Sequence, residues 1–176
     1  MSEVTLRDGS RVIVRPVRPE DKPLFVEGFE RFGEDSRYRR FMGMKKRLSD
    51  QELAFFSEVD HHDHEALVGL DVECGAGVGV ARYIRLGAGD AAEAAVAIVD
   101  AWQGRGLGGL LLARLAARAH GEGIHRFRAW MLSGSRDMLH LFEKLGDLRV
   151  VARDGDSVEI EVELEAARVR RPAGAR

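Results

Sequence analysis

The alternation of apolar and polar residues along the chain predicts strands and helices in succession. A strand is expected over residues 11–15, where β-branched residues follow a turn signal at Asp8-Gly9. A helix is expected to begin at Pro19 and to end near Gly33, and Ser49 begins another with a capping-box pattern, Ser49-Asp50-Gln51-Glu52. The first third of the chain is therefore expected to be mostly helical after one strand.

The remainder alternates between strands and helices around a glycine cluster. The expected strands cover residues 65–72, 77–86, 91–99, 124–132, 148–152 and 158–164. One helix is expected from Leu107, where leucines recur every three or four residues, and another near Met138. The order is strand, helices, three strands, helix, strand, helix and two strands, which predicts a single domain that mixes both kinds of element.

Residues 91–121 (AAEAAVAIVDAWQGRGLGGLLLARLAARAHG) give the strongest functional signal. An apolar run leads into four closely spaced glycines, and a helix follows. Glycines allow the backbone to approach a ligand closely, and the first amides of a helix have no helical partner and carry partial positive charge. A strand, a glycine turn and a helix in this order predict a binding site for an anion.

Two common phosphate-binding motifs fit this stretch poorly. Residues 104–109 satisfy G-x-G-x-x-G, but about 100 residues precede them, and no carboxylate occurs at 127–132, where a dinucleotide ribose would be held. A Walker A loop is excluded because no Lys-Ser/Thr pair follows the glycines. The anion is therefore expected to belong to another kind of ligand.

The run Gln103-Gly104-Arg105-Gly106-Leu107-Gly108 after an apolar strand resembles the acetyl-CoA motif of the GNAT superfamily of N-acetyltransferases. The alternative is a structural glycine turn without a ligand. The resemblance implies an α/β (α+β) GNAT fold, with a mixed central sheet of about seven strands and about four flanking helices. It also implies acetyl-CoA as cosubstrate and no metal.

The same resemblance implies the residues that would hold the cofactor. Loop amides would bind its pyrophosphate, and the end of the preceding strand would bind its pantetheine arm. Arg105 is expected either to meet a phosphate or to be solvated. The implied cofactor-binding residues are Ile98, Val99, Gln103, Gly104, Arg105, Gly106, Leu107, Gly108, Gly109 and Ser135.

Three positions depart from the family pattern. One is Asp147, where the glycine before it is usually followed by a phenylalanine in family members. Ser135 stands where family members usually have an asparagine that contacts the cofactor arm, and it is expected to make a shorter hydrogen bond. Phe142 stands where many members have a tyrosine that protonates the leaving thiolate. The thiolate is therefore expected either to leave without this acid, since an ordinary thiol has a pKa of about 8.5, or to be protonated by another group.

Glu93 is the candidate catalytic residue. It is the one charged residue within 91–99, and strand alternation places it on the same face as Ala95 and Ala97. A carboxylate here can remove the proton from an ammonium group before the amine attacks a thioester. The resemblance implies this general-base role, and the alternative is a glutamate at the strand end that faces solvent.

Several further segments are similar to the acetyltransferase domain of bacterial protein lysine acetyltransferases. They are LRDGSRVIVRPVRPEDKPLF, SRYRRF, LSDQEL, DHHDHEALVGL and AEAAVAIVDAWQGRGLG, in this order. This similarity implies a lysine of a protein as the acceptor. A small-molecule amine as acceptor, and a non-catalytic module that senses acetyl-CoA, remain alternatives.

The tract Asp60-His61-His62-Asp63-His64-Glu65 suggests a metal site at first sight. Consecutive residues cannot all face one ion, so a solvated loop before a strand is the favoured interpretation. A place for His64 at the acceptor site stays open.

Composition narrows the class of protein. The chain has 176 residues, a net charge of -2 and a pI of about 6.3, so no general attraction to nucleic acid is expected. Cys74 is the one cysteine, which excludes an internal disulfide, and no apolar signal or membrane segment is present. We expect a cytoplasmic protein with one domain over residues 1–165 and a basic, disordered tail over 166–176. Its oligomeric state is open, with a homodimer among the options.

Overall fold

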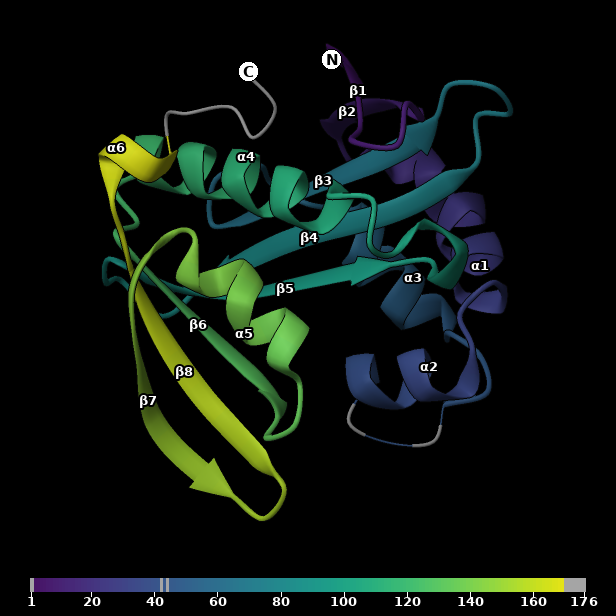
Figure 1. The fold of residues 1–176 in the computed structure, drawn as a ribbon. Coiled ribbons are helices and arrows are strands. Elements are labelled where there is room, and N and C mark those ends of the chain that lie inside the picture. The colour runs from purple at the N-terminus through teal and green to yellow at the C-terminus, as the bar shows by residue number, and fades with distance from the viewer. Residues whose placement is uncertain (1, 42, 44, 170–176) are drawn as a thin grey trace.

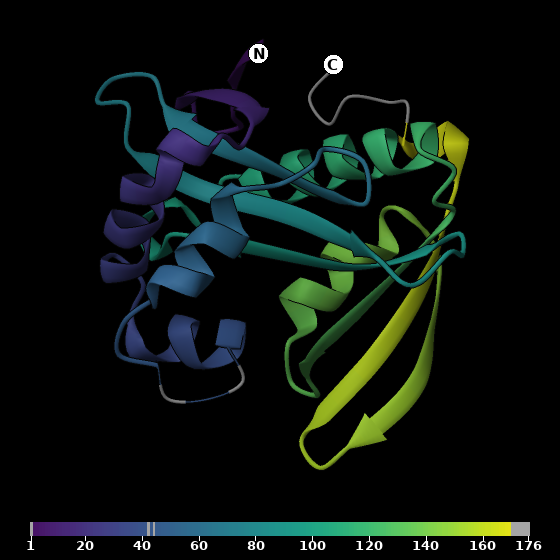
Figure 2. The same cartoon turned by 180° about the vertical axis from the view of Figure 1, so that it is seen from behind.

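A mixed sheet with helices on both faces forms the whole described structure (Figure 1). The computed structural model describes residues 2–41, 43 and 45–169. Helices α4 and α5 lie on one face of the sheet, and α1, α2 and α3 lie on the other, as the view from behind shows (Figure 2). A mixed sheet flanked by helices agrees with the fold class expected from the sequence.

The sheet has eight strands in the order β1-β2-β3-β4-β5-β6-β8-β7. They are β1 (Ser2–Thr5), β2 (Arg11–Pro16), β3 (His64–Asp71), β4 (Gly77–Arg85), β5 (Ala91–Ile98), β6 (Arg126–Leu132), β7 (Gly146–Asp154) and β8 (Ser157–Leu164). The expected number was about seven. The additional strand is β1, which is four residues long and gains its order by antiparallel pairing with β2 across the turn at Gly9.

The helical segments in the described residues are η1 (Pro19–Asp21), α1 (Lys22–Glu30), α2 (Glu34–Phe41), α3 (Asp50–Ser57), η2 (Asp100–Trp102), α4 (Leu107–Gly121), α5 (Arg136–Glu143) and α6 (Ala166–Val169). The first predicted helix thus divides into η1 and α1 and stops before Gly33. Ser49 forms the predicted capping box with Glu52. Among the described helices, none is long and apolar enough to cross a membrane.

The predicted tail is partly helical. Residues 166–169 form the short helix α6, which lies beside α4. Residues 170–176 of the predicted tail lie outside the described residues.

Helix α4 is fixed to the sheet by its leucines. Leu107, Leu111 and Leu115 are almost completely buried. Gly79 on β4 allows this close approach, because a Cβ there would lie 3.2 Å from Leu107 Cδ2 and 3.2 Å from Leu111 Cδ1. Each buried leucine contributes about 1.5–3 kcal/mol, so packing on the sheet holds the start of α4 against the end of β5.

Strands β5 and β6 form the one parallel pair among the described strands, and they separate early. Their register covers Ala91↔Arg126, Ala92↔Phe127 and Glu93↔Arg128. Beyond this point β6 continues with β8, and the two parts of the sheet diverge (Figure 1). The second half of β5 therefore has an open edge on the side that β6 leaves.

Candidate active site

Glu93 lies on β5 and faces away from α4. Ala92, Ala94 and Val96 belong to the core beneath α4. Since side chains alternate along a strand, Glu93 and Ala97 project to the opposite face, where Ala97 lines a pocket. The predicted shared face of Glu93 and Ala97 therefore agrees with the structure.

The Glu93 side chain is exposed to solvent. In the described part of the chain it has no hydrogen bond and no ion pair. Arg128, its register partner on β6, instead pairs with the buried Glu161, with Nε 2.8 Å from Oε2. A carboxylate without a protein partner can accept a proton from an incoming ammonium group.

The open edge of β5 offers backbone groups to a ligand. The Val99 amide donates to the Val78 carbonyl (3.1 Å), so alternate residues on β5 face β4, while Val96 and Ile98 face the open side. The Ile98 amide is therefore suited to bind a cofactor arm. Both backbone groups of Val99 are used within the protein, because its carbonyl accepts from the Trp102 amide (2.7 Å).

The glycine turn forms an anion cradle at the start of α4. Gly104 and Gly106 have φ of +76° and +93°, which other residues rarely adopt. The Leu110 amide reaches the Gly106 carbonyl (3.1 Å), so the preceding amides, those of Leu107 and Gly108 among them, point out of the helix start. The helix dipole adds partial positive charge, which favours an anion at this position.

Gln103 and Asp100 fix this loop in place. Gln103 Nε2 donates to the Ile98 carbonyl (3.1 Å), to Asp100 Oδ1 (3.3 Å) and to Ser36 Oγ on α2 (3.3 Å). Asp100 Oδ2 accepts from the Gly33 amide (3.1 Å). The Gln103 side chain therefore joins the cradle to β5 and α2, while its own amide is bound to the Asp100 carbonyl.

Arg105 holds the loop to the turn after β1. Its Nη1 lies 2.8 Å from Ser10 Oγ and 3.1 Å from Asp8 Oδ2, and its Nη2 donates to the Ala101 carbonyl (2.8 Å). The guanidinium also lies 4.7 Å from the Trp102 ring centroid. The cation is therefore bound to protein groups in this structure, and its contact with a cofactor phosphate stays a prediction.

Arg7 is a candidate that the sequence analysis missed. A Cβ placed on Gly106 would lie 3.6 Å from Arg7 Nε, so this exposed cation stands beside the cradle. Its position about 100 residues before the glycines gave no local signal. The fold brings the two together because β1 and β2 lie next to the start of α4 (Figure 1).

Ser135 and Phe142 belong to the segment after β6. Ser135 is half-buried at the start of α5, where its carbonyl accepts from the Leu139 amide (3.0 Å). Its role toward a cofactor stays a prediction. Phe142 is 1% exposed within the core, so its ring packs among apolar residues and supplies no proton.

A pocket lies on the Glu93 face of the sheet, beneath α1, α2 and α3. Its empty space is about 590 Å³, including the mouth. Most of the wall is apolar, with aromatic residues from all three helices. Arg40 from α2 and Arg82 from β4 are the charged residues that line it in the described chain. The pocket and Glu93 therefore occupy the same side of β5.

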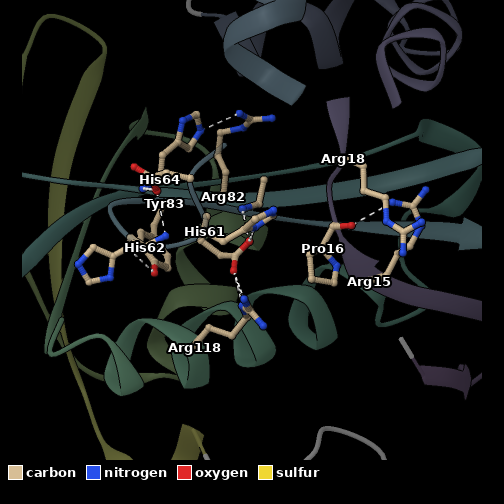
Figure 3. A network of polar contacts seen from close by, with 12 residues as sticks. Arg15, Pro16, Arg18, His61, His62, His64, Arg82, Tyr83 and Arg118 are labelled. Carbon is tan, nitrogen blue, oxygen red and sulfur yellow. Dashed lines mark hydrogen bonds and ion pairs between the residues drawn. The ribbon is translucent and has the colours of Figure 1, made fainter. Parts of the chain in front are cut away.

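His64 supports Arg82 at the edge of this pocket. Its Nε2 lies 3.2 Å from Arg82 Nη1, and burial together with the Arg82 charge lowers the pKa of His64 (Figure 3). A neutral His64 can accept a hydrogen bond from the guanidinium. His64 thus contacts a residue of the pocket wall. Its place at the acceptor site, which the sequence left open, stays a prediction.

The remaining residues of the histidine tract have structural partners. His61 Nδ1 lies 2.8 Å from the carboxylate of the fully buried Glu65, which also binds Arg118 of α4 (Figure 3). His62 binds Glu122. The described residues contain no group of three His, Cys, Asp or Glu side chains placed to hold a metal. The loop is therefore tied to the sheet and α4, and Glu65 is buried where a solvated end was expected.

A strand pair that opens, a glycine turn at a helix start and an unpaired carboxylate lie together at this edge of the sheet in the described residues. The chain belongs to the GNAT acetyltransferase family, since residues 28–147 match the family model described as "Acetyltransferase (GNAT) family".

Known proteins support this assignment at the level of sequence and fold. The chain is 32% identical over 160 residues to acetyltransferase Pat of Mycolicibacterium smegmatis, covering 87% of this chain and 48% of that protein. It is 31% identical to acetyltransferase PA5475 of Pseudomonas aeruginosa, covering 81% and 77%. The crystal structure of the GNAT domain of S. lividans PAT superposes with a TM-score of 0.85 at 32% identity, covering 93% and 96%. The chain thus spans about half the length of the first of these relatives.

Proposed function

We propose that this protein transfers the acetyl group of acetyl-CoA directly to a primary amine, with a protein lysine as the preferred acceptor. One observation carries the proposal. The unpaired Glu93 carboxylate stands at the last position where β5 pairs with β6, where the sheet begins to open. The glycine cradle begins at the far end of the same open edge.

The described residues fit acetyl-CoA. The amides at the start of α4 would hold the pyrophosphate, and the backbone of Val96 and Ile98 would bind the pantetheine arm along the open edge. Bound there, acetyl-CoA supplies an activated acetyl thioester. Val99 is left out of this proposal because its backbone groups are already paired.

Glu93 would take the proton that the acceptor must lose. A primary amine is an ammonium group at neutral pH, so its lone pair becomes available only after deprotonation. The exposed Glu93 can receive this proton directly or through water. No acid from Phe142 assists the leaving thiolate, and none is required for a thiol with a pKa of about 8.5.

The lysine acceptor rests on similarity. Motifs from the first strand to the glycine cradle resemble bacterial protein lysine acetyltransferases, and two relatives carry the names Pat and PAT. A small-molecule amine as acceptor and a non-catalytic acetyl-CoA sensor are the competing hypotheses.

The test is release of free CoA thiol by the full chain, with lysine-containing proteins, lysine peptides and small amines as acceptors. Thiol release that depends on a lysine protein, together with acetyl-lysine found by mass spectrometry, supports the proposal. Release with small amines alone selects the second hypothesis. Acetyl-CoA binding without release for any acceptor selects the sensor.

A further inference from the structure

The pocket on the Glu93 face has an excess of positive charge at one end. Arg40 is half-buried, and Arg82 is 4% exposed. The other described lining residues are apolar or glycine. No carboxylate lines the described wall. Charges removed from water are unfavourable unless a counter-ion or hydrogen bonds compensate, so an anionic ligand would stabilise this part of the pocket.

Arg82 has donors that the protein leaves unused. Its Nη1 lies 3.2 Å from His64 Nε2, and its Nη2 donates to the Phe56 carbonyl (3.2 Å). The Nε atom is buried and has no hydrogen-bond partner among the described residues. A guanidinium has five N–H donors, and buried donors are normally paired. The unpaired Nε therefore points to a ligand group that accepts hydrogen bonds.

Arg40 adds a second cation beside the first. It has no hydrogen bond or ion pair in the part of the chain that the structure describes. Burial and the charge of Arg40 lower the pKa of Arg82 to about 9, and burial lowers the pKa of Arg40, opposed by Glu93. The two guanidinium groups thus repel each other, while Glu93 lies within electrostatic range of Arg40.

We propose that this pocket binds a carboxylate carried by the amine acceptor. Arg40 and Arg82 hold the carboxylate, aromatic side chains such as Phe25 and Phe56 cover the apolar chain of the acceptor, and the amine lies at Glu93. This rests on the proposed acetyl transfer. An acceptor that carries both an ammonium group and a carboxylate is favoured, because Arg40 repels an amine that brings only a positive charge.

Such a carboxylate has two sources. It can belong to a free amino acid, or to an acidic side chain near the target lysine of a peptide. Both sources present the same chemistry to Arg40 and Arg82, so the experiment uses matched pairs of each kind.

Binding is measured first, without acetyl-CoA. NMR chemical-shift titrations of the full chain compare hexanoate with hexanamide, which differ in the charged group alone. We expect hexanoate to bind more tightly, and Arg40→Gln to weaken its binding by about 10- to 100-fold, as for loss of a charge-assisted hydrogen bond. Arg39→Gln, an exposed neighbour on α2, is the matched control and should leave binding unchanged. Equal affinity for hexanoate and hexanamide overturns the proposal.

Kinetics then locate the carboxylate on the acceptor. Thiol release is compared for ω-amino acids of four to eight carbons and their amides, and for lysine peptides with flanking Glu or Gln. We expect a lower KM for the carboxylate member of at least one pair, and loss of this preference in Arg40→Gln with recovery in Arg40→Lys. The pair that shows it identifies the source. A fall in kcat without a change in preference overturns the proposal.

Two outcomes separate this proposal from the proposed function. Acetyl transfer without any carboxylate preference leaves the function intact and overturns the pocket assignment. Tight hexanoate binding without transfer to any amine overturns the proposed acetyl transfer. It also shows that the bound carboxylate does not belong to an amine acceptor. If Arg40→Gln impairs the use of succinyl-CoA and leaves the acceptor preference unchanged, the pocket holds the acyl group and the proposal is wrong.

Discussion

Glu93 and Arg128 are the last residues that pair β5 with β6. Arg128 turns to the buried Glu161, so the Glu93 carboxylate is left without a partner where the strands begin to separate. The same register position therefore ends the parallel pairing and leaves a carboxylate without a protein partner in the described residues. The following residues of β5 lead directly to the cradle at Gly106.

Replacement of Glu93 by glutamine tests the base. We expect Glu93→Gln to lower turnover by roughly 10²- to 10⁴-fold, because the amide cannot take a proton, while the Kd for acetyl-CoA changes little. The measurement is thiol release across a range of pH, with calorimetry for binding. Glu73→Gln, in the exposed β3–β4 turn, is the control. Unchanged turnover at every pH would remove Glu93 from this role.

Gly106 tests the cradle. An alanine at φ of +93° is strained by about 1–2 kcal/mol, and its Cβ would stand where the cofactor phosphate must approach. We expect Gly106→Ala to weaken acetyl-CoA binding by more than about tenfold. Gly155→Ala, in the β7–β8 turn at φ of +54°, carries similar strain and should bind normally. Normal binding by the Gly106 variant would mean that the phosphates lie elsewhere.

Arg7 tests whether the cation beside Gly106 contacts the cofactor. We expect Arg7→Gln to raise the Kd for acetyl-CoA about fivefold, the effect of roughly 1 kcal/mol from an exposed charge. The difference should fade in high salt, which screens exposed charges. Arg153→Gln, an exposed change of the same kind on β7, should have no effect. Equal affinities for wild type and Arg7→Gln at low salt would contradict the contact.

Phe142 tests the missing acid. The ring is buried in the core, so a tyrosine hydroxyl there would lose its hydrogen bonds to water and find no polar group placed to replace them among the described core residues. We expect Phe142→Tyr to lower the free energy of unfolding by about 1–3 kcal/mol and not to increase turnover. Urea denaturation and thiol release measure the two effects. A rise in turnover would show that the position can serve as an acid.

Asp21 gives the fold a dependence on pH. Burial raises the pKa of Asp21, but hydrogen bonds from Arg15 (2.6 and 2.7 Å) and the Arg18 amide (2.8 Å) outweigh it and hold the pKa below its ordinary value. A lowered pKa means that the stabilisation is complete above about pH 4 and is lost as pH falls through the folded value.

We therefore expect Asp21→Asn to cost about 3 kcal/mol at pH 7, because it leaves the largely buried Arg15 side chain unpaired, and progressively less below pH 4. Urea denaturation at several pH values measures this. Glu3→Gln, which removes the exposed pair with Arg11, should cost less than about 1 kcal/mol. A difference between wild type and Asp21→Asn that stays constant down to pH 2 would refute the linkage.

Local patterns predicted much of the fold. The capping box at Ser49, the periodic leucines of α4 and the glycine turn before it depend on contacts within a few residues, and each is present as expected. The structure adds elements whose order depends on pairing or packing with distant segments. Strand β1 pairs with β2, and α6 lies against α4.

The sequence by itself indicated the family and predicted the glycine turn and the strand face on which Glu93 lies, because strand, turn and helix signals and the face of a strand residue are local properties. The tertiary structure decided which side chains meet that site. Arg7, Arg40 and Arg82 come from separate elements, and only sheet register and helix packing bring their charges to the cradle and the pocket. The structure likewise committed Arg105 to Asp8 and Ser10, since hydrogen bonds between distant segments leave no periodic trace in the chain.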